Sequence, residues 1–534
     1  MSAVGSNLYI DDLMNFTEAT TSNKKSEIAE FFAHTNILIT GGTGFLGCLV
    51  IEKLLRCCPG ITKLYMIVRP KKGKTALERY KEIFGEVTYD KLRHEQPNFL
   101  QKVVMLEGDA AKENFGLLPE DINALMDVNI IFHVAAVVRF NEKLRTALNI
   151  NVKSIKFLLS FAKKLPNLKA FVHVSTAFSH CIHKNIDERH YTDIMDADKI
   201  LALLDIFDDE KFEQIEAVLR GKWPNTYVFT KALGENIILK YSSDLPVCIV
   251  RPSIVTATFK EPISAWINNV YGATGIVLGS SIGLLHTLCC VKEYVAEIIP
   301  ADYVVSNIVS SAWDVANRKA AIKSADQVSN LTNEDKIPIY NSVSSCQNPI
   351  TWGDFMKKNE AYGLEIPTIK SIWYYMLILN RYLFVHNVCV FLLHKVPAAI
   401  VDTLVYLAGQ KPVLLDIYSK IEKFSDVIRY FSTSEWKFKN DNVIKLWNKM
   451  NSVDQEIFCV NVQNMDWNEY FYQHIRGLRI YLLKDPMDTL QASRERFRKL
   501  RIAHYSIISI IILITLWIAT LFISFLWSFC PLSR

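Results

Sequence analysis

Short apolar segments alternate with helix-like segments over residues 36 to about 310. Six of these segments read as strands: Ile37–Thr40, Leu64–Val68, Val103–Glu107, Ile130–Val134, Phe171–Val174 and Val247–Arg251. Continuous apolar runs of this length are typical of strands that are buried on both faces, and their alternation with helices is typical of a parallel sheet with crossover helices. The pattern therefore predicts an α/β fold built on a doubly wound parallel sheet.

The rest of the chain divides by composition. Residues 1–35 are polar and have no apolar signal-peptide core, so we expect a mobile N-terminal lead-in. The α/β domain is expected to occupy residues 36–370, because residues 311–370 add loop signals and one more strand-like segment, IPIYNSV. Residues 371–484 are rich in aromatic residues and predict a helical C-terminal domain, which a basic linker follows at 485–504.

Residues 505–529 form a run of 25 residues without a charged side chain. About 20 apolar residues cross a bilayer as a helix, so this run predicts a transmembrane helix; a buried helix of a soluble protein is the alternative. The preceding RERFRKLR segment is strongly basic, and a basic flank stays on the cytosolic side. We therefore expect a C-terminal membrane anchor with the folded body in the cytosol.

A second apolar stretch, residues 371–397, is interrupted by Arg381 and His386. We interpret it as a buried or membrane-facing helical element, and a second membrane span is the alternative.

Composition excludes several classes of function. The net charge of +5 is too small to indicate nucleic-acid binding. The 11 cysteines are scattered, include two adjacent pairs and form no CxxC motif. Neither a metal site nor a disulfide framework is expected, and a reducing compartment fits better.

The first predicted strand is followed by the glycine-rich segment TGGTGFLG, which leads into a helical pattern. A strand, a glycine turn and a helix N-terminus together form a site for phosphate, because the backbone approaches the anion closely and the helix offers free N–H groups. A tight turn without a ligand is the alternative. The candidate cofactor-binding residues here are Gly41, Thr43, Gly44, Phe45, Leu46 and Gly47.

The second predicted strand ends in VRPKKGK. NAD-dependent enzymes commonly carry an acidic residue here, which binds the ribose 2′-hydroxyl, whereas Arg69 and the following lysines suit a 2′-phosphate. This predicts NADPH; a solvated basic loop is the alternative. Asp109 is a candidate partner for the adenine, Ala135 and Ala136 are small enough for close approach of the cofactor, and Pro252 is a further candidate contact.

The segment YVFTK places Tyr227 and Lys231 four residues apart, on one face of a helix. An ammonium group beside a phenol favours the phenolate, so we expect Lys231 to lower the pKa of Tyr227 and to prepare it for proton transfer. A hydroxyl from Ser175 or Thr176, after the fifth strand, would hold the oxygen of the substrate. This arrangement resembles the extended short-chain dehydrogenase/reductase superfamily.

Many further segments are similar to the fatty acyl-CoA reductase family. They include TGGTGFLG, FHVAAVVRFNEKL, FVHVSTAFSH, YVFTKALGE, VRPSIVTA and, in the second half, LAGQKPVLLDIYSKI and MDWNEYFYQHIRGLRIYLLKD. The resemblance covers roughly residues 36–484. It implies an NADP-binding reductase domain over 36–370, and a membrane enzyme of the endoplasmic reticulum or peroxisome.

The resemblance also implies an activity: reduction of a long-chain fatty acyl-CoA to a primary alcohol with two NADPH, through an aldehyde. Tyr227 would donate the proton, and Lys231 would bind the nicotinamide ribose. Thr176, ranked before Ser175 because it directly precedes Ala177, would donate to the carbonyl oxygen.

The sequence departs from the family pattern in two places. Phe178 stands where the family commonly has tyrosine, and Ser264 and Ala265 stand where it commonly has glycine before the Trp-Ile pair. An acidic, helix-like segment at about 193–220 is expected to be an insertion near the substrate entrance. Two other readings remain: a membrane-bound hydroxysteroid or sterol dehydrogenase, and a scaffold without catalytic activity.

Overall fold

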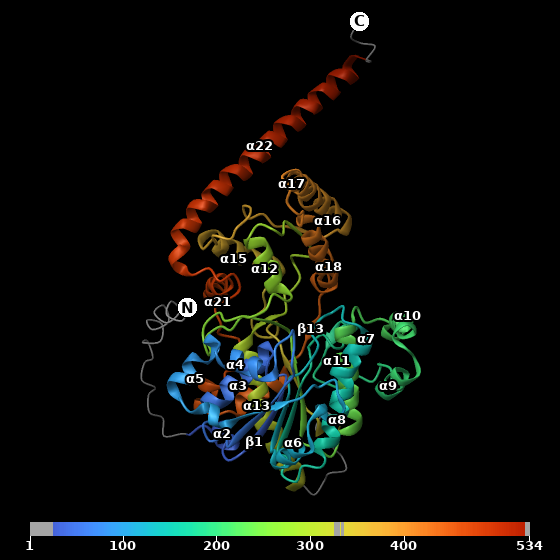
Figure 1. Ribbon diagram of the computed structural model, residues 1–534, viewed down its shortest axis with the longest axis vertical. Coiled ribbons are helices and arrows are strands. Elements are labelled where there is room, and N and C mark those ends of the chain that lie inside the picture. The colour runs from blue at the N-terminus through green and yellow to red at the C-terminus, as the bar shows by residue number, and fades with distance from the viewer. Residues whose placement is uncertain (1–24, 325–331, 333–335, 529–534) are drawn as a thin grey trace.

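A seven-stranded parallel sheet forms the centre of the lower lobe in Figure 1. The computed structural model describes residues 25–324, 332 and 336–528. The strand order is β11-β7-β5-β4-β1-β2-β3, and every neighbouring pair in the sheet is parallel. The strands are β1 (Asn36–Thr40), β2 (Lys63–Val68), β3 (Val103–Glu107), β4 (Ile130–His133), β5 (Ala170–Val174), β7 (Val247–Pro252) and β11 (Ile339–Ser342). The predicted fold class is confirmed, and the IPIYNSV segment supplies the edge strand β11.

Helices cover both faces of the sheet, because successive side chains of each strand point to opposite sides. In β1, Ile37 and Ile39 pack with α3 (Phe45–Cys57) and α13 (Ala301–Ser324) on one face. Leu38 packs on the other face with α7 (Leu144–Leu148), α8 (Ser154–Ala162) and α11 (Thr226–Tyr241). The helices of this first lobe are α2 (Glu27–Phe32), α3 (Phe45–Cys57), α4 (Ala76–Phe84), α5 (Asp90–Glu95), α6 (Pro119–Ala124), α7 (Leu144–Leu148), α8 (Ser154–Ala162), α9 (Ala197–Ile206), α10 (Asp209–Arg220), α11 (Thr226–Tyr241) and α13 (Ala301–Ser324).

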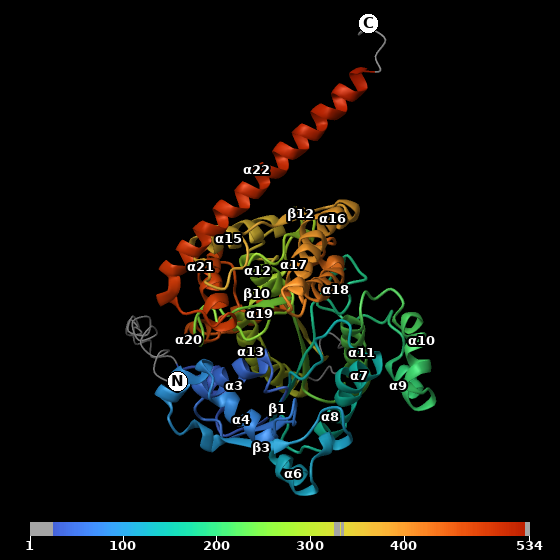
Figure 2. The same ribbon diagram turned by 45° about the horizontal axis from the view of Figure 1, so that its top comes forward.

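A second, mainly helical lobe stands at the carboxyl ends of the sheet strands (Figures 1 and 2). Its elements are α12 (Ala273–Ser281), α15 (Trp352–Glu365), α16 (Leu383–Val390), η7 (Phe391–Lys395), α17 (Val396–Leu407), α18 (Leu414–Ser432), α21 (Trp467–Gly477) and η8 (Leu478–Leu482). Short parallel pairs join β8 (Ile254–Thr256) to β10 (Ile298–Pro300), β9 (Thr287–Cys289) to β12 (Ile378–Asn380), and β6 (Asn185–Ile186) to β13 (Lys437–Phe438).

The two lobes are not consecutive in the chain. One apolar core combines side chains from 257–298, from 350–366 and from 428–490. Conversely, α19 (Asp441–Lys449) and the segment after α20 (Ser452–Ile457) pack back on the core of the first lobe. Position 370 is therefore not a boundary in space, because the second lobe takes helices from both sides of it.

The expectation of a mobile lead-in is wrong for residues 25–35. Helix α2 occupies residues 27–32, and its Ile28 and Phe32 side chains are fully buried in the core of the first lobe. Ser26 caps this helix and donates a hydrogen bond of 2.6 Å to the carboxylate of Asp454. Residues 1–24 lie outside the described residues.

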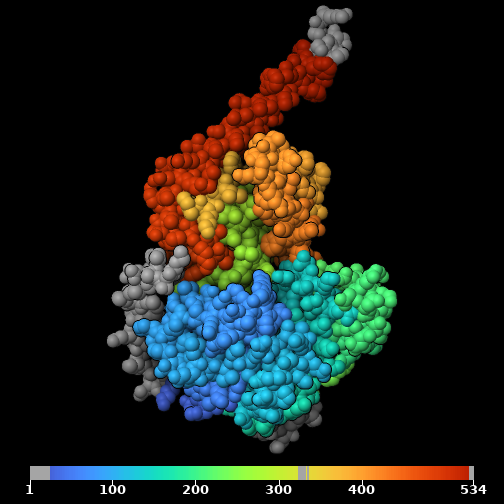
Figure 3. All heavy atoms as spheres, in the orientation of Figure 1, coloured from blue at the N-terminus to red at the C-terminus, as the bar shows by residue number. Residues whose placement is uncertain are grey.

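Helix α22 (Leu490–Ser528) is one continuous helix that projects from the body (Figure 3). Residues 490–504, expected to form a basic linker, are its first turns. They dock on the second lobe: the indole N–H of Trp373 donates to Nδ1 of His504 at 3.0 Å, and the rings of Tyr374 and Phe497 lie 4.9 Å apart. Beyond these turns the helix is long and apolar enough to cross a membrane, and its most apolar stretch is not buried.

The structure explains one departure from the family pattern. Ala265 has a φ of 59°, in the left-handed region that favours glycine. The residue turns the chain toward Trp266, whose ring stacks on Phe45 of the glycine turn at 5.4 Å. An alanine here keeps the turn at a cost in backbone strain.

Ala265→Gly should therefore raise the free energy of unfolding by about 1 kcal/mol, because the left-handed conformation is unfavourable for residues with a Cβ. Gly409→Ala is the matched opposite change: Gly409 has a φ of 74°, and an added Cβ would touch nothing within 4 Å. It should lower the free energy of unfolding by a similar amount. Denaturant titration of the detergent-solubilised chain measures both changes. If Ala265→Gly were only as stable as the parent, the backbone at Ala265 would not be strained.

Candidate active site

The glycine turn lies between the end of β1 and the start of α3. A Cβ on Gly41 would come within 2.5 Å of the Ala135 nitrogen, and a Cβ on Gly47 within 2.1 Å of the Gly41 oxygen, so both are required by the packing of the turn. Gly44 differs, because it is exposed and a Cβ there would meet only the Gly41 oxygen, at 3.2 Å. It is the N-cap of α3 and makes no side-chain cap hydrogen bond. The first N–H groups of α3 are thus available to an anion, which fits a dinucleotide pyrophosphate.

Cations gather beside this turn. Arg79, on α4, donates to Oγ1 of Thr43 at 2.9 Å and to the backbone oxygen of Arg69 at 2.5 Å. Arg69 lies 3.4 Å from the carboxylate of Asp109, so the residue predicted to meet the adenine holds the arginine in place. Arg79 was missed by sequence reasoning because it lies on a helix after the basic loop. Helix α4 has the ordinary amphipathic pattern of a surface helix, in which an arginine such as Arg79 does not stand out.

The electrostatics of this corner show that the cations are close together. The pKa of Lys71 is lowered, first by burial and then by the nearby positive charges of Arg69, Arg79 and Arg139. Neighbouring positive charges repel one another, and a bound anion would reduce that repulsion. The arrangement suits a phosphate group next to the end of β2.

Tyr227 and Lys231 lie on α11, and Thr176 follows β5. Burial raises the pKa of Tyr227 to about 12. The hydrogen bond with the Thr176 side chain lowers the same pKa but is the smaller effect. The Lys231 ammonium donates instead to the Val174 oxygen at 2.6 Å. Burial lowers the pKa of Lys231 to about 8, with Glu235 opposing that shift. The expectation that Lys231 lowers the pKa of Tyr227 is therefore not met: the ammonium is bonded to the end of β5, and burial dominates the phenol.

The Ser175 hydroxyl is bonded to Glu235. It donates to this carboxylate at 2.5 Å, and the same carboxylate accepts from Ser179 at 2.9 Å, from Nε of Arg251 at 3.0 Å and from Nη2 of Arg251 at 2.5 Å. Nε2 of His180 lies 3.0 Å from it. Although burial by itself raises the pKa of Glu235, Arg251 and His180 hold that pKa well below its usual range. The geometry favours Thr176 over Ser175 as the hydroxyl next to the phenol.

Asn151 is a second residue that sequence reasoning missed. It lies in the π-helical turn η5 (Asn149–Lys153) and is almost fully buried. Its side chain accepts from the Val137 nitrogen at 2.9 Å and donates to Oγ1 of Thr230 at 3.0 Å. Such turns are frequent at functional sites. Asn151 joins the loop after β4, where Ala135 and Ala136 lie, to the helix that carries Tyr227.

The remaining predicted residues line the same region. Pro252 ends β7, and its oxygen accepts from the Ala177 nitrogen at 2.8 Å and from the Thr176 hydroxyl at 3.4 Å. Ala135 and Ala136 are partly exposed at the end of β4, and so are Phe45 and Leu46 at the start of α3.

Aromatic side chains from both lobes meet next to Tyr227. The ring of Phe140 lies 5.6 Å from Tyr227 and 5.7 Å from Phe431, the penultimate residue of α18. Phe178, the other departure from the family pattern, contacts Phe431 at 5.3 Å and Trp436 at 5.4 Å. The second lobe thus supplies one wall of the site, and the wall is apolar.

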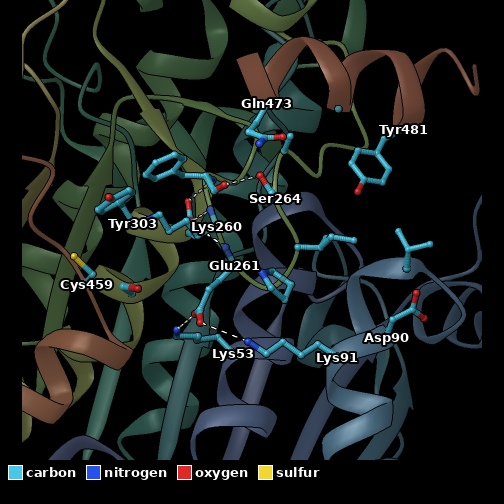
Figure 4. Close-up of a pocket in the computed structure, with 18 of the residues that line it drawn as sticks. Lys53, Asp90, Lys91, Lys260, Glu261, Ser264, Tyr303, Cys459, Gln473 and Tyr481 are labelled. Atoms are coloured by element: carbon cyan, nitrogen blue, oxygen red, sulfur yellow. Dashed lines mark hydrogen bonds and ion pairs between the residues drawn. The ribbon is translucent and has the colours of Figure 1, made fainter. Parts of the chain in front are cut away.

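A cavity of about 690 Å³ lies elsewhere between the lobes (Figure 4). None of its lining residues is a predicted site residue. Two of its cations, Lys53 and Lys91, pair with Glu261, as the dashed lines in Figure 4 show. Within residues 25–324, 332 and 336–528, no group of three or more His, Cys, Asp or Glu side chains is arranged to hold a metal ion.

The buried Glu235 network makes a stability prediction. Glu235→Gln should lower the free energy of unfolding by about 3–5 kcal/mol, because it leaves the fully buried Arg251 without its counter-charge. Glu213→Gln is the control: Glu213 pairs with Lys143 on the surface, where solvent screens the charges and a single pair contributes little. Denaturant titration compares the two. An equal decrease in the free energy of unfolding for both variants would show that the buried pair stabilises the fold no more than the surface pair does.

Comparison with known proteins identifies the family of the chain. Two family models, both described as male sterility protein, match residues 39–308 and 393–485, and the first is an NAD-binding model. The chain is 35% identical over 494 residues to fatty acyl-CoA reductase wat of Drosophila melanogaster, covering 92% of this chain and 93% of that one. It is 34% identical to fatty acyl-CoA reductase 1 of Rattus norvegicus, covering 91% and 92%.

Among solved structures, the chain resembles the reductase domain of a nonribosomal peptide synthetase from Mycobacterium tuberculosis, with a TM-score of 0.55, 15% identity and coverage of 86% and 96%. This likeness supports the extended reductase fold. Three findings agree: the family-model matches, the identities over nine-tenths of the chain and the nicotinamide-dinucleotide fold. The protein therefore belongs to the fatty acyl-CoA reductase (male sterility protein) family of the extended short-chain dehydrogenases/reductases.

Proposed function

We propose that the protein reduces a long-chain fatty acyl-CoA to a primary fatty alcohol and free CoA, with two NADPH consumed in two successive reductions. The observation that carries this proposal is the placement of Tyr227, beside Thr176 and one turn from Lys231, at the carboxyl end of the sheet and against an apolar wall. The relatives named as fatty acyl-CoA reductases support the same substrate class.

NADPH, when bound, supplies hydride to the carbonyl carbon of the substrate. The residues of the chain orient and protonate the carbonyl oxygen of the substrate. The Thr176 hydroxyl orients it, and Tyr227 protonates it. Because burial raises the pKa of Tyr227, the phenol keeps its proton at neutral pH and can give it to the alkoxide formed by hydride addition, which is the stronger base. The first reduction of the thioester gives a hemithioacetal, which expels CoA to leave an aldehyde. The second reduction repeats the same proton donation and gives the alcohol.

Lys231 would hold the nicotinamide ribose. An ammonium group has three donors, and only one of them is directed to the Val174 oxygen. Its positive charge, in a buried place next to the end of β5, also stabilises negative charge on the oxygen that Tyr227 protonates.

The choice of NADPH rests on the cations beside the glycine turn. Arg69 and Arg79 present guanidinium groups, which bind phosphate through two parallel hydrogen bonds. A dehydrogenase of hydroxysteroids that uses NAD is expected to carry an acidic residue in place of Arg69, which this chain does not have. A scaffold without activity gives no reason for Thr176, Tyr227 and Lys231 to be assembled together.

The membrane attachment completes the proposal. Helix α22 would cross a membrane of the endoplasmic reticulum or peroxisome, with its basic first turns and the whole folded body in the cytosol. An acyl chain partitions into lipid, so this attachment places the enzyme where its substrate is concentrated.

Tyr227→Phe tests the chemical step. The variant should bind NADPH like the parent, while alcohol formation from acyl-CoA and from added aldehyde falls by about 10²–10⁴-fold, because the proton donor is lost. Tyr241→Phe removes a hydroxyl from the same helix, where it donates to Asp198, and should keep turnover within a fewfold. The measurement is turnover per NADPH-binding site. A Tyr227→Phe enzyme that binds NADPH and still forms alcohol within a fewfold of the parent would refute the assignment.

Arg79→Ala and Arg69→Ala test the cofactor. A charge-assisted contact contributes about 1.5–3 kcal/mol, so each variant should weaken NADPH binding by about 10- to 100-fold and leave NADH binding nearly unchanged. Lys81→Ala, an exposed residue on the same helix as Arg79, is the control. Titration of both cofactors gives the ratio of affinities. If neither arginine variant changes the preference for NADPH, these arginines do not recognise the 2′-phosphate.

A further inference from the structure

The continuous helical segment Leu383–Leu407, formed by α16, η7 and α17, is long and apolar enough to cross a membrane. Its burial pattern is regular, because the buried residues recur every fourth position along its whole length. These are His386, Val390, His394, Ala398 and Asp402. The segment therefore has one inward stripe and one outward face over all 25 of its residues.

The inward stripe carries three polar side chains, His386, His394 and Asp402, and each one is bonded to the body of the second lobe. Nδ1 of His386 lies 3.1 Å from Oγ1 of Thr287, and Nε2 of His394 accepts from the His286 nitrogen at 3.0 Å. Asp402 accepts from the first backbone nitrogens of α18, at 2.9–3.2 Å. These bonds attach the segment to the second lobe near its start, in its middle and near its end, so it lies along the protein surface.

The outward face is mainly apolar and exposed; its polar residues are Asn387, Thr403 and Lys395, and Lys395 pairs with Glu422 of α18. Phe384 is 78% exposed, Phe391 57%, Leu404 61% and Leu407 75%. Arg381 and Lys411 flank the segment at its two ends and are also exposed. An exposed apolar face of this extent marks an interaction site, and flanking cations suit the headgroups of lipids.

The position of this face selects its partner. Figure 1 places α16 and α17 at the far end of the second lobe, on the side toward which α22 projects, and Figure 2 again shows α16 at that edge. The first turns of α22 are fixed to the same lobe through Trp373 and Tyr374, which precede strand β12 and the segment in the chain. A bilayer crossed by α22 therefore meets the face of α16 and α17 without any rearrangement of the lobe.

We propose that residues 383–407 lie in the surface of the membrane that α22 crosses, as an interfacial helix with its apolar face among the acyl chains, rather than as a second span. This inference rests on the proposed anchoring by α22. From the end of α17, helix α18 runs to Phe431 in the aromatic wall beside Tyr227. The membrane contact is thus directly connected to the site that would receive an acyl chain.

The test uses the full chain in phosphatidylcholine nanodiscs, with a fluorescent amino acid placed singly at Phe384, Phe391 or Leu404. The lipids are brominated either near the headgroup or near the chain end, and quenching reports contact and depth. Val218 on α10, 77% exposed like Phe384, is the control away from the membrane, and Leu516 in α22 is the control within it. NADPH binding confirms that each labelled chain is folded.

We expect all three positions to be quenched to a similar extent, and more by the shallow bromines than by the deep ones. Position 218 should show no quenching, and position 516 should be quenched more by the deep bromines. Deeper quenching at 391 than at 384 and 404 would indicate a span and overturn the proposal. Quenching at 516 alone would also overturn it, since another protein surface would then cover the face. Loss of quenching at 516 as well would refute the anchoring itself.

Discussion

The buried ion pair between Glu235 and Arg251 is the interaction on which the site depends. Both side chains are almost fully removed from solvent, so either charge would strongly destabilise the fold if its partner were absent. The pair joins α11 to β7, and Glu235 lies one turn beyond Lys231 on the same helix. By accepting from Ser175, Glu235 also fixes the loop after β5, which leaves Thr176 beside Tyr227.

The same pair reaches the second lobe. Arg251 donates to the backbone oxygens of Asp187 and Arg189, which follow β6, and β6 pairs with β13 of the C-terminal part of the chain. β13 carries Phe438, which packs on Phe178 with a ring separation of 5.9 Å. The orientation of α11, which carries Tyr227, and the position of the apolar wall are therefore set by one connected group of contacts. This connection gives a physical reason for a reductase of this kind to need its C-terminal lobe.

Much of the fold was predictable because its signals are local. Fully buried parallel strands are continuous apolar runs, and the glycine turn and the Tyr227–Lys231 spacing each fall within a few residues. Arg79 and Asn151 were not predictable, because their partners lie far away in the chain: Asn151 bonds to Thr230, 79 residues later. The use of residues 257–298 in the second lobe and the packing of α2 on the core follow from long-range contacts for the same reason. The pKa of Tyr227 was misjudged because sequence gives the spacing of two side chains but not the burial that decides their charge.

The most direct measurement of the central claim is the fate of the hydride. The full-length enzyme in lipid is given a long-chain acyl-CoA and NADPH that carries deuterium at the transferred position, and the products are identified by mass. Two reductions at one site predict a primary alcohol with two deuterium atoms on its first carbon, together with free CoA. A product that stops at the aldehyde with one deuterium, or an acyl-CoA that gains none, would contradict the account.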